Sequence, residues 1–150
     1  MKKQKGFSLI ELLIVVAIIL IIAAIAIPNL LRSKMAANEA SAVGSLRSLN
    51  TACITYSTTY GSYPTSLANL GPGSPATSTT ADLIDSVLAS GTKSGYTFTF
   101  TGGAGTTYSI TAIPVTVGTT GQRAFFTNQS GVIRANTTGA SPTVTDPPIS

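Results

Sequence analysis

One carboxylate inside an apolar run is the most informative feature of this 150-residue chain. Glu11 lies four residues after Phe7 in residues 7–27, where the only other polar side chain is Ser8. A carboxylate near the end of a membrane span costs about 2–3 kcal/mol even on lenient insertion scales, so it usually has a partner charge. Residues 7–27 contain no basic side chain. The amino group of Phe7 would serve only if the chain were cut after Gly6, so the pattern predicts a processed protein whose new N-terminus matters.

The element that carries Glu11 is long enough to cross a bilayer. Its 21 apolar-run residues extend about 31 Å as a helix. Lys2, Lys3 and Lys5 precede the run, which favours the cytoplasmic side for that end. An ordinary secretory signal would have a shorter apolar core followed by a small-residue cleavage site. A plain membrane anchor fits the length but leaves Glu11 unexplained.

The N-terminal region contains the segment Gly6-Phe7-Ser8-Leu9-Ile10-Glu11-Leu12-Leu13-Ile14-Val15-Val16-Ala17-Ile18. This segment resembles the signature of type IV pilins and of the pseudopilins of type II secretion, and the match extends over roughly the first thirty residues. Pro28 also falls where that family breaks its first helix. The resemblance implies a leader, residues 1–6, removed by a prepilin peptidase between Gly6 and Phe7, and N-methylation of Phe7.

The same resemblance implies a structural role. The subunit would wait in the bacterial inner membrane and polymerise at an assembly platform there into a filament of its own copies. The filament would be an extracellular type IV pilus or, as the alternative, a periplasmic type II secretion pseudopilus. We expect Glu11 of an incoming subunit to pair with the Phe7 amine of a neighbour. Because a buried ion pair contributes little net stability but is costly to break, its role would be to fix register.

Charge and residue inventory disfavour two other classes. The nominal charge is +4, but three of the nine basic residues lie in the leader, which leaves six against five acidic ones. The remaining basic residues are scattered, so no specific nucleic-acid binding is expected. The chain has no histidine, which removes the commonest general base and metal ligand, and we expect neither an enzyme nor a cofactor. A membrane-anchored binding protein that stays monomeric is the remaining alternative.

Beyond the span, which covers residues 7–27, the helix is expected to continue to about Tyr60. Pro28 predicts a kink or local melting over residues 24–29. One face carries small and apolar side chains at helical spacing, so it should pack on a globular head over residues 61–150. This stripe is Ala36, Ala40, Val43, Leu46, Leu49, Cys53, Tyr56 and Tyr60. Cys53 is the only cysteine, so it forms no intramolecular disulfide. We expect it to be buried as a small apolar side chain.

The head begins with a turn-rich segment, residues 61–95. One short turn of helix is predicted over residues 65–71, after the glycine and proline that end the long helix. Thr80 is predicted to cap a helix over residues 81–89 that Gly91 ends. Asp82 and Asp85 would lie at its positive end.

The fold class predicted for the whole chain is α+β, the ladle fold of the pilin family. Residues 96–135 change to a period of two, in which aromatic and aliphatic side chains alternate with threonine. Short turns between these strands predict an antiparallel sheet. Tyr96, Phe98 and Phe100 would face the long helix. Pro114 suits an edge or a bulge.

The tail, residues 136–150, is rich in threonine, proline and serine and is expected to be flexible. Major pseudopilins related to this family often bind calcium through a C-terminal loop. Asp146 is the only acidic residue after Asp85, so we predict no metal site. The serine and threonine density fits either O-glycans on an exposed filament or a bare polar coat.

Overall fold

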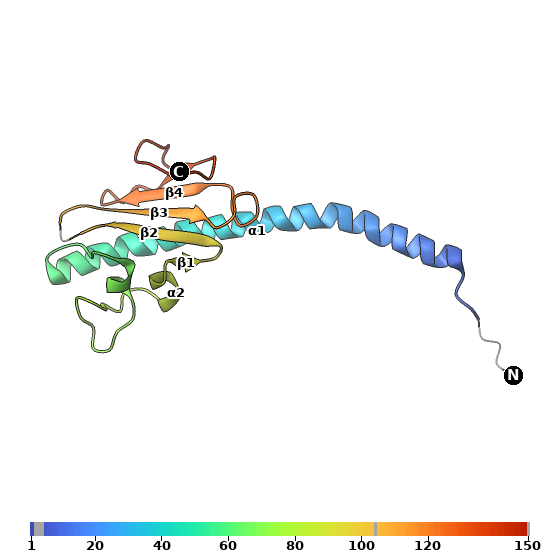
Figure 1. The fold of residues 1–150 in the computed structure, drawn as a ribbon, viewed down its shortest axis with the longest axis horizontal. Coiled ribbons are helices and arrows are strands. Elements are labelled where there is room, and N and C mark those ends of the chain that lie inside the picture. The colour runs from blue at the N-terminus through green and yellow to red at the C-terminus, as the bar shows by residue number, and fades with distance from the viewer. Residues whose placement is uncertain (2–4, 104, 150) are drawn as a thin grey trace. The chain divides into compact units, whose positions relative to one another are not determined.

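The computed structural model describes residues 1, 5–103 and 105–149. The chain divides into two compact parts, Met1–Lys34 and Met35–Ser150. The predicted α+β class, a long N-terminal helix with a small antiparallel sheet, is confirmed. In chain order the elements are α1 (Leu9–Tyr60), the 3-10 turn η1 (Leu67–Leu70), α2 (Ser86–Ala89), β1 (Thr92–Lys93), β2 (Tyr96–Gly102), β3 (Tyr108–Pro114), β4 (Ala124–Asn128) and β5 (Arg134–Asn136) (Figure 1).

The first part of the chain consists mainly of the N-terminal half of α1. The helix begins at Leu9, two residues after the predicted start, and the amide of Leu12 donates to the Ser8 carbonyl at 3.2 Å. Pro28 lies inside α1, and the helical conformation continues without a break across residues 24–29. Of the predicted kink or local melting, local melting is therefore wrong, and the kink stays a prediction. A proline removes one amide donor, and the residues on both sides keep their helical conformation.

The second part of the chain is built around one five-stranded sheet. Its order is β1-β2-β3-β4-β5, and every neighbouring pair is antiparallel, as the short turns predict. β1 was not predicted, since two residues are too few to show a period. Pro114 ends β3 opposite Tyr96, beyond the residues 109–112 that pair with β4. The missing amide of Pro114 therefore removes no bond to β4.

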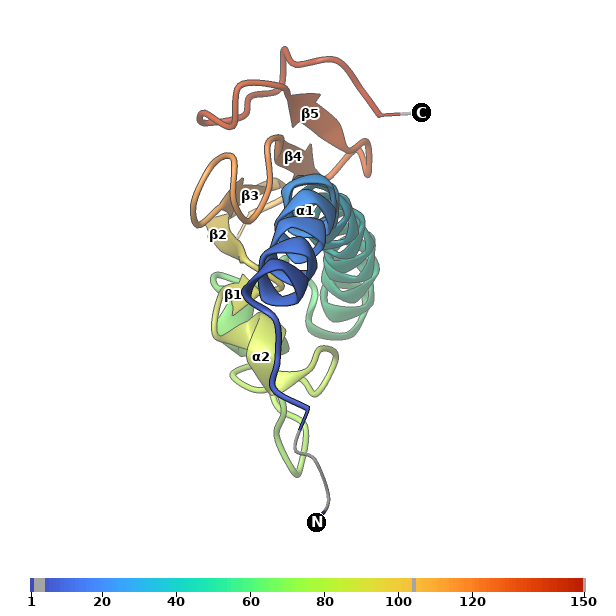
Figure 2. The same cartoon turned by 90° about the vertical axis from the view of Figure 1, so that its right-hand side faces the viewer.

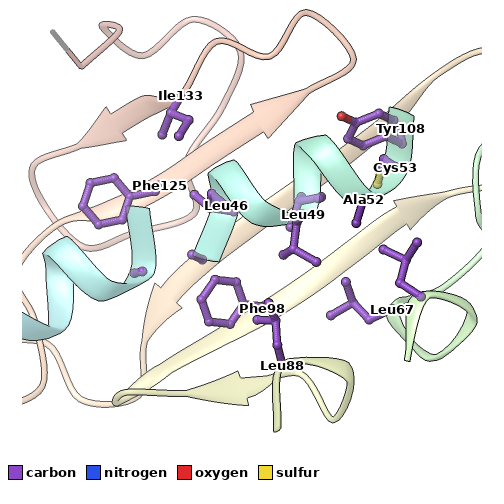
Figure 3. Close-up of a cluster of buried hydrophobic side chains, with 14 of the residues drawn as sticks. Leu46, Leu49, Ala52, Cys53, Leu67, Leu88, Phe98, Tyr108, Phe125 and Ile133 are labelled. Carbon is purple, nitrogen blue, oxygen red and sulfur yellow. The ribbon is translucent and has the colours of Figure 1, made fainter. Parts of the chain in front are cut away.

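The core of this part lies between the sheet and the residues of α1 from Ala42 to Tyr56. Alternate residues of β2 and β3 are buried, including Tyr96 and Phe98, as their period predicts. Figure 3 shows Leu46 and Leu49 of α1 in one cluster with Phe98 of β2 and Phe125 of β4. Burying an aliphatic or aromatic side chain of this size contributes about 1.5–3 kcal/mol. The buried members from α1 are Ala42, Leu46, Leu49, Ala52, Cys53 and Tyr56.

The segment between α1 and the sheet differs from its prediction. Thr80 caps no helix. Asp85 is the cap of the short α2, where its Oδ1 accepts the Leu88 amide at 2.8 Å. The backbone before it bonds elsewhere: the Ala81 amide donates to Asn69, and the Leu83 and Ile84 amides to Leu70. These long-range bonds hold residues 81–84 in an irregular, non-helical conformation against η1, which overrides their local helix propensity. Asp82 adopts a left-handed φ of 55°.

The C-terminal segment also differs from the free tail that was expected. Its backbone returns along β5, where the Ile149 amide donates to Ile133 and the Ala135 amide to Pro147, at 2.9 and 3.0 Å. The guanidinium of Arg134 donates to the Asp146 carbonyl at 2.9 Å. Figure 2 shows this segment beside β5, at the end of the sheet opposite α2. It covers the outer edge of β5, which would otherwise present unpaired backbone groups.

Candidate functional site

The predicted processing site lies just before α1. Gly6 and Phe7 precede the first helical residue, and both are exposed. Phe7 is 78% exposed, and a Cβ built on Gly6 would meet no heavy atom within 4 Å. A protease could therefore reach the peptide bond between them from several directions. The part of the leader at residues 2–4 lies outside the described residues.

Glu11 occupies the first turn of α1. A carboxylate there is favoured by the partial positive charge of the helix N-terminus, although that effect is small. The salt bridges of the described residues join Lys93 to Asp85 and Arg123 to Glu39, so none of them includes Glu11. Glu11 lies four residues after Phe7 in the chain. No basic side chain of the described residues forms a salt bridge with it. Pro28 lies farther along the same helix.

The surface around Glu11 is apolar on all sides of the helix. Consecutive residues 12–16 are each between 45% and 59% exposed, so the exposed apolar surface encircles α1 rather than forming a stripe. In a water-soluble domain such a helix would be buried. By length and composition α1 could cross a membrane. The large exposed apolar side chains of residues 7–31 are Phe7, Leu9, Ile10, Leu12, Leu13, Ile14, Val15, Val16, Ile18, Ile19, Leu20, Ile21, Ile22, Ile25, Ile27, Leu30 and Leu31.

The sequence did not indicate two groups of polar contacts in the second part of the chain. The first group joins Glu39 and Asn38 of α1 to the β3–β4 connection. Glu39 accepts the backbone amides of Gln122 and Arg123 at 2.9 and 3.0 Å and pairs with Arg123 Nε at 2.8 Å. Asn38 Nδ2 donates to the Thr120 carbonyl at 2.8 Å. These bonds fasten the β3–β4 connection to α1. Because the partners are more than 80 residues apart in the chain, no local pattern could have indicated them.

The other missed contact is a buried polar cluster around Asn50. Its Nδ2 donates to Thr127 Oγ1 at 2.9 Å, and its Oδ1 accepts the Tyr108 hydroxyl at 3.0 Å. Thr127 Oγ1 donates in turn to the Val132 carbonyl at 3.2 Å. Every buried side-chain polar atom of the described chain has a partner. The cluster therefore fixes α1 on β3 and β4 without an unsatisfied group.

The described residues of the second part offer little for metal binding or nucleophilic catalysis. In the part of the chain that the structure describes, no three His, Cys, Asp or Glu side chains come together as a metal site would require. Cys53 is buried as predicted, beside Tyr108 (Figure 3). Burial raises the pKa of its thiol to about 12, against a smaller opposing effect of the Tyr108 hydrogen bond. The thiolate is therefore disfavoured, and Cys53 is not poised as a nucleophile.

Comparison with known proteins agrees with the N-terminal pattern. Residues 1–27 match the family model described as the prokaryotic N-terminal methylation motif. The chain is 62% identical over 39 residues to the type IV wide pilus major component PilA4 of Thermus thermophilus, which covers 26% of this chain and 30% of that protein. It is 40% identical over 65 residues to the type II secretion system core protein G of Vibrio cholerae, covering 43% and 44%.

A third relative is the type IV major pilin protein PilA of Myxococcus xanthus, 50% identical over 50 residues, which are 33% of this chain and 23% of that protein. The chain spans less than half the length of each of these relatives. Its homologues are thus structural proteins of two kinds, type IV pilins and type II secretion pseudopilins.

Proposed function

We propose that this chain, whose first 27 residues carry the N-terminal methylation motif and whose homologues are type IV pilins and type II secretion pseudopilins, is a structural subunit of a type IV pilus. A prepilin peptidase would cleave between Gly6 and Phe7, and the new amino group of Phe7 would be methylated. The mature subunit would stay in the inner membrane through α1. At an assembly platform it would then join a filament of identical copies outside the cell.

The observation that carries this proposal is the exposed apolar surface around α1 with its one carboxylate. Lipid tails are as apolar as the helix, so moving the helix from lipid into a bundle of its own kind brings no hydrophobic gain that depends on register. A polar contact at one depth does depend on register. Glu11 would supply it by pairing with the Phe7 amine of a neighbouring copy. Breaking such a buried pair costs several kcal/mol, so a misplaced subunit would be rejected.

The test compares Glu11→Ala and Glu11→Gln with Ser8→Ala, which changes the other polar side chain of residues 7–27. All three should insert into the membrane and be cleaved, because the span remains apolar. The two Glu11 variants should yield few or no filaments, whereas Ser8→Ala should assemble normally. Mass spectrometry should find a mature chain that begins with methylated Phe7. Filaments of normal yield and register from Glu11→Ala, or a mature chain that begins at Met1, would refute the proposal.

A type II secretion pseudopilin is the second candidate, and one comparison favours it. Core G proteins match between 42% and 47% of this chain, whereas the two pilins match 26% and 33%. Electron microscopy of cells with and without the chain separates the two functions. Loss of long surface filaments indicates the pilus. Unchanged surface filaments with loss of secreted proteins indicate the pseudopilus.

A further inference from the structure

Most charged side chains of the second part of the chain are held within it. Residues 35–150 contain four acidic and four basic side chains, so the side-chain charges of this part balance. Two acid–base pairs are salt bridges, each at 2.8 Å. Beside β5, the guanidinium of Arg134 donates to the Asp146 carbonyl, and the Asp146 carboxylate accepts the Thr143 amide. The six side chains accounted for in this way are Glu39, Asp85, Lys93, Arg123, Arg134 and Asp146.

The two remaining charges belong to Asp82 and Arg47, one of each sign. Both residues are exposed, and neither takes part in a salt bridge of the described residues. Their charges are therefore equal and opposite but do not meet within one copy. In a polymer of identical copies, each copy offers both charges to its neighbours. The two side chains can then pair between copies without any other component.

Asp82 is presented by a fixed backbone. Its amide donates to the Gly71 carbonyl at 2.8 Å, and the next amide, that of Leu83, donates to Leu70 at 2.9 Å. Its φ of 55° lies in the left-handed region, which Asp tolerates better than most residues do. The position of the carboxylate thus depends mainly on the rotamer of its own side chain. Such a group loses little conformational freedom when it binds a partner.

Arg47 lines a groove between α1 and the C-terminal segment, with a volume of about 330 Å³. Val43 of α1 and Ile149 of the C-terminal segment contribute apolar walls. Glu39 and Arg123 also line the groove, but they neutralise each other in their salt bridge. The lining therefore carries one net positive charge, that of Arg47. A groove of this kind is complementary to a single carboxylate on an otherwise uncharged surface.

We propose that the Asp82 carboxylate of one copy binds the Arg47 guanidinium of the next copy in the filament. This inference rests on the proposed function, because it needs a polymer. The contact joins two different surfaces of identical copies, and such a heterologous contact repeats into an open filament when it does not close into a ring. An exposed ion pair adds little to stability by itself. Its effect is on orientation, since complementary charges determine which way two heads dock. Arg32 and Lys34 of the first part of the chain are the competing cations.

A carbodiimide can detect this contact, because it joins a carboxylate to a neighbouring amine as an amide and does not couple a guanidinium. Filaments of the Arg47→Lys variant keep the positive charge and gain a reactive amine. After treatment they should give a ladder of dimers, trimers and longer products on denaturing gels, and mass spectrometry should find position 47 joined to Asp82. Arg47→Lys combined with Asp82→Asn is the matched control, and it should lose that linkage.

Neutral variants provide a second measurement. Arg47→Gln and Asp82→Asn should each lower filament yield severalfold, and the double variant should be no worse than either single variant. Urea unfolding of the detergent-solubilised subunit verifies that each head is folded. Losses that multiply in the double variant would show that the two side chains act independently, which overturns the pairing.

The crosslinking results separate this inference from the proposed function. Filaments of normal yield in which position 47 is not joined to Asp82 overturn the pairing and leave the proposed function unaffected. A linkage between Lys34 and Asp82 in the parent filaments also overturns it and identifies Lys34 as the partner. A parent chain that forms no filaments removes both proposals.

Discussion

Glu39 and Arg123 are joined twice, once through the backbone and once through the side chain. The Arg123 amide donates to Oε1 of Glu39 at 3.0 Å, and its Nε donates to Oε2 at 2.8 Å. The side chain of Glu39 is only 12% exposed. The guanidinium carbon also lies 5.4 Å from the centre of the Phe125 ring, within cation–π distance. This pair therefore links α1, the β3–β4 loop and β4.

The first prediction is that Glu39→Gln destabilises the head in a pH-dependent way. Burial acts to raise the pKa of Glu39, but the hydrogen bonds from Gln122 and Arg123 outweigh it, and the pKa is lowered from 4.5. A lowered pKa in the folded state means that the carboxylate stabilises the fold above its ordinary pKa. That contribution is lost as the pH falls below about 4.5 through the folded-state value.

Glu39→Gln should therefore lower the free energy of unfolding at pH 7 by about 1.5–3 kcal/mol, the usual range for hydrogen bonds to a charged group. Urea unfolding in detergent, followed by tyrosine circular dichroism, measures it. The difference from the parent chain should shrink as the pH falls below 4.5. Asp82→Asn is the control, since Asn also tolerates a left-handed φ and Asp82 has no salt bridge among the described residues. A difference that does not vary with pH would contradict the pairing.

Local patterns predicted the parts of this fold that local interactions determine. The alternation at Tyr96, Phe98 and Phe100 predicts a strand with one buried face, and Tyr96 and Phe98 are buried there. The predicted cap at Thr80 is wrong because the backbone of Leu83 bonds to Leu70. Only the folded chain brings those two residues together, so local propensity could not reveal that contact.

The functional residues likewise include some that local sequence could indicate and others that it could not. Gly6, Phe7 and Glu11 could be singled out because they lie within six residues of one another and their types are unusual beside an apolar run. Asn50 could not, since a polar residue on an amphipathic helix is ordinarily expected to face water. Its burial depends on Tyr108 and Thr127, which lie 58 and 77 residues away in the chain. Polar partners that are distant in sequence leave no periodic signal.

The second prediction concerns this buried cluster. Asn50→Ala should lower the free energy of unfolding by about 1–3 kcal/mol, because the buried Tyr108 hydroxyl loses its acceptor. Thr127 keeps its bond to the Val132 carbonyl, so the main loss is at Tyr108. The double variant Asn50→Ala with Tyr108→Phe provides the control, and its cost should be less than the sum of the two single costs. Additive costs in urea unfolding would show that the two side chains do not interact.

The third prediction contrasts two glycines. Gly44 lies on an exposed part of α1, and a Cβ there would meet nothing within 4 Å. Gly44→Ala should therefore raise the free energy of unfolding by about 0.5–1 kcal/mol through helix propensity. A Cβ at Gly121 would instead collide with the ring and hydroxyl of Tyr96, which is fully buried and donates to the Arg123 carbonyl. Gly121→Ala should be destabilising by about 1–3 kcal/mol. Equal effects of the two substitutions on urea unfolding would exclude this packing.

The last prediction is that Cys53 resists alkylation while the head is folded. Burial raises the pKa of its thiol to about 12, although the Tyr108 hydrogen bond acts in the opposite direction, and the reactive form is the thiolate. Iodoacetamide at pH 8 should therefore leave Cys53 unmodified in the folded chain and modify it in denaturant, as mass spectrometry would show. The matched control is Thr51→Cys in a Cys53→Ala background, because residue 51 is exposed on the same helix. That thiol should react when folded, and faster as the pH rises through about 8.5. Equal rates at the two positions would mean that α1 opens from the sheet within the reaction time.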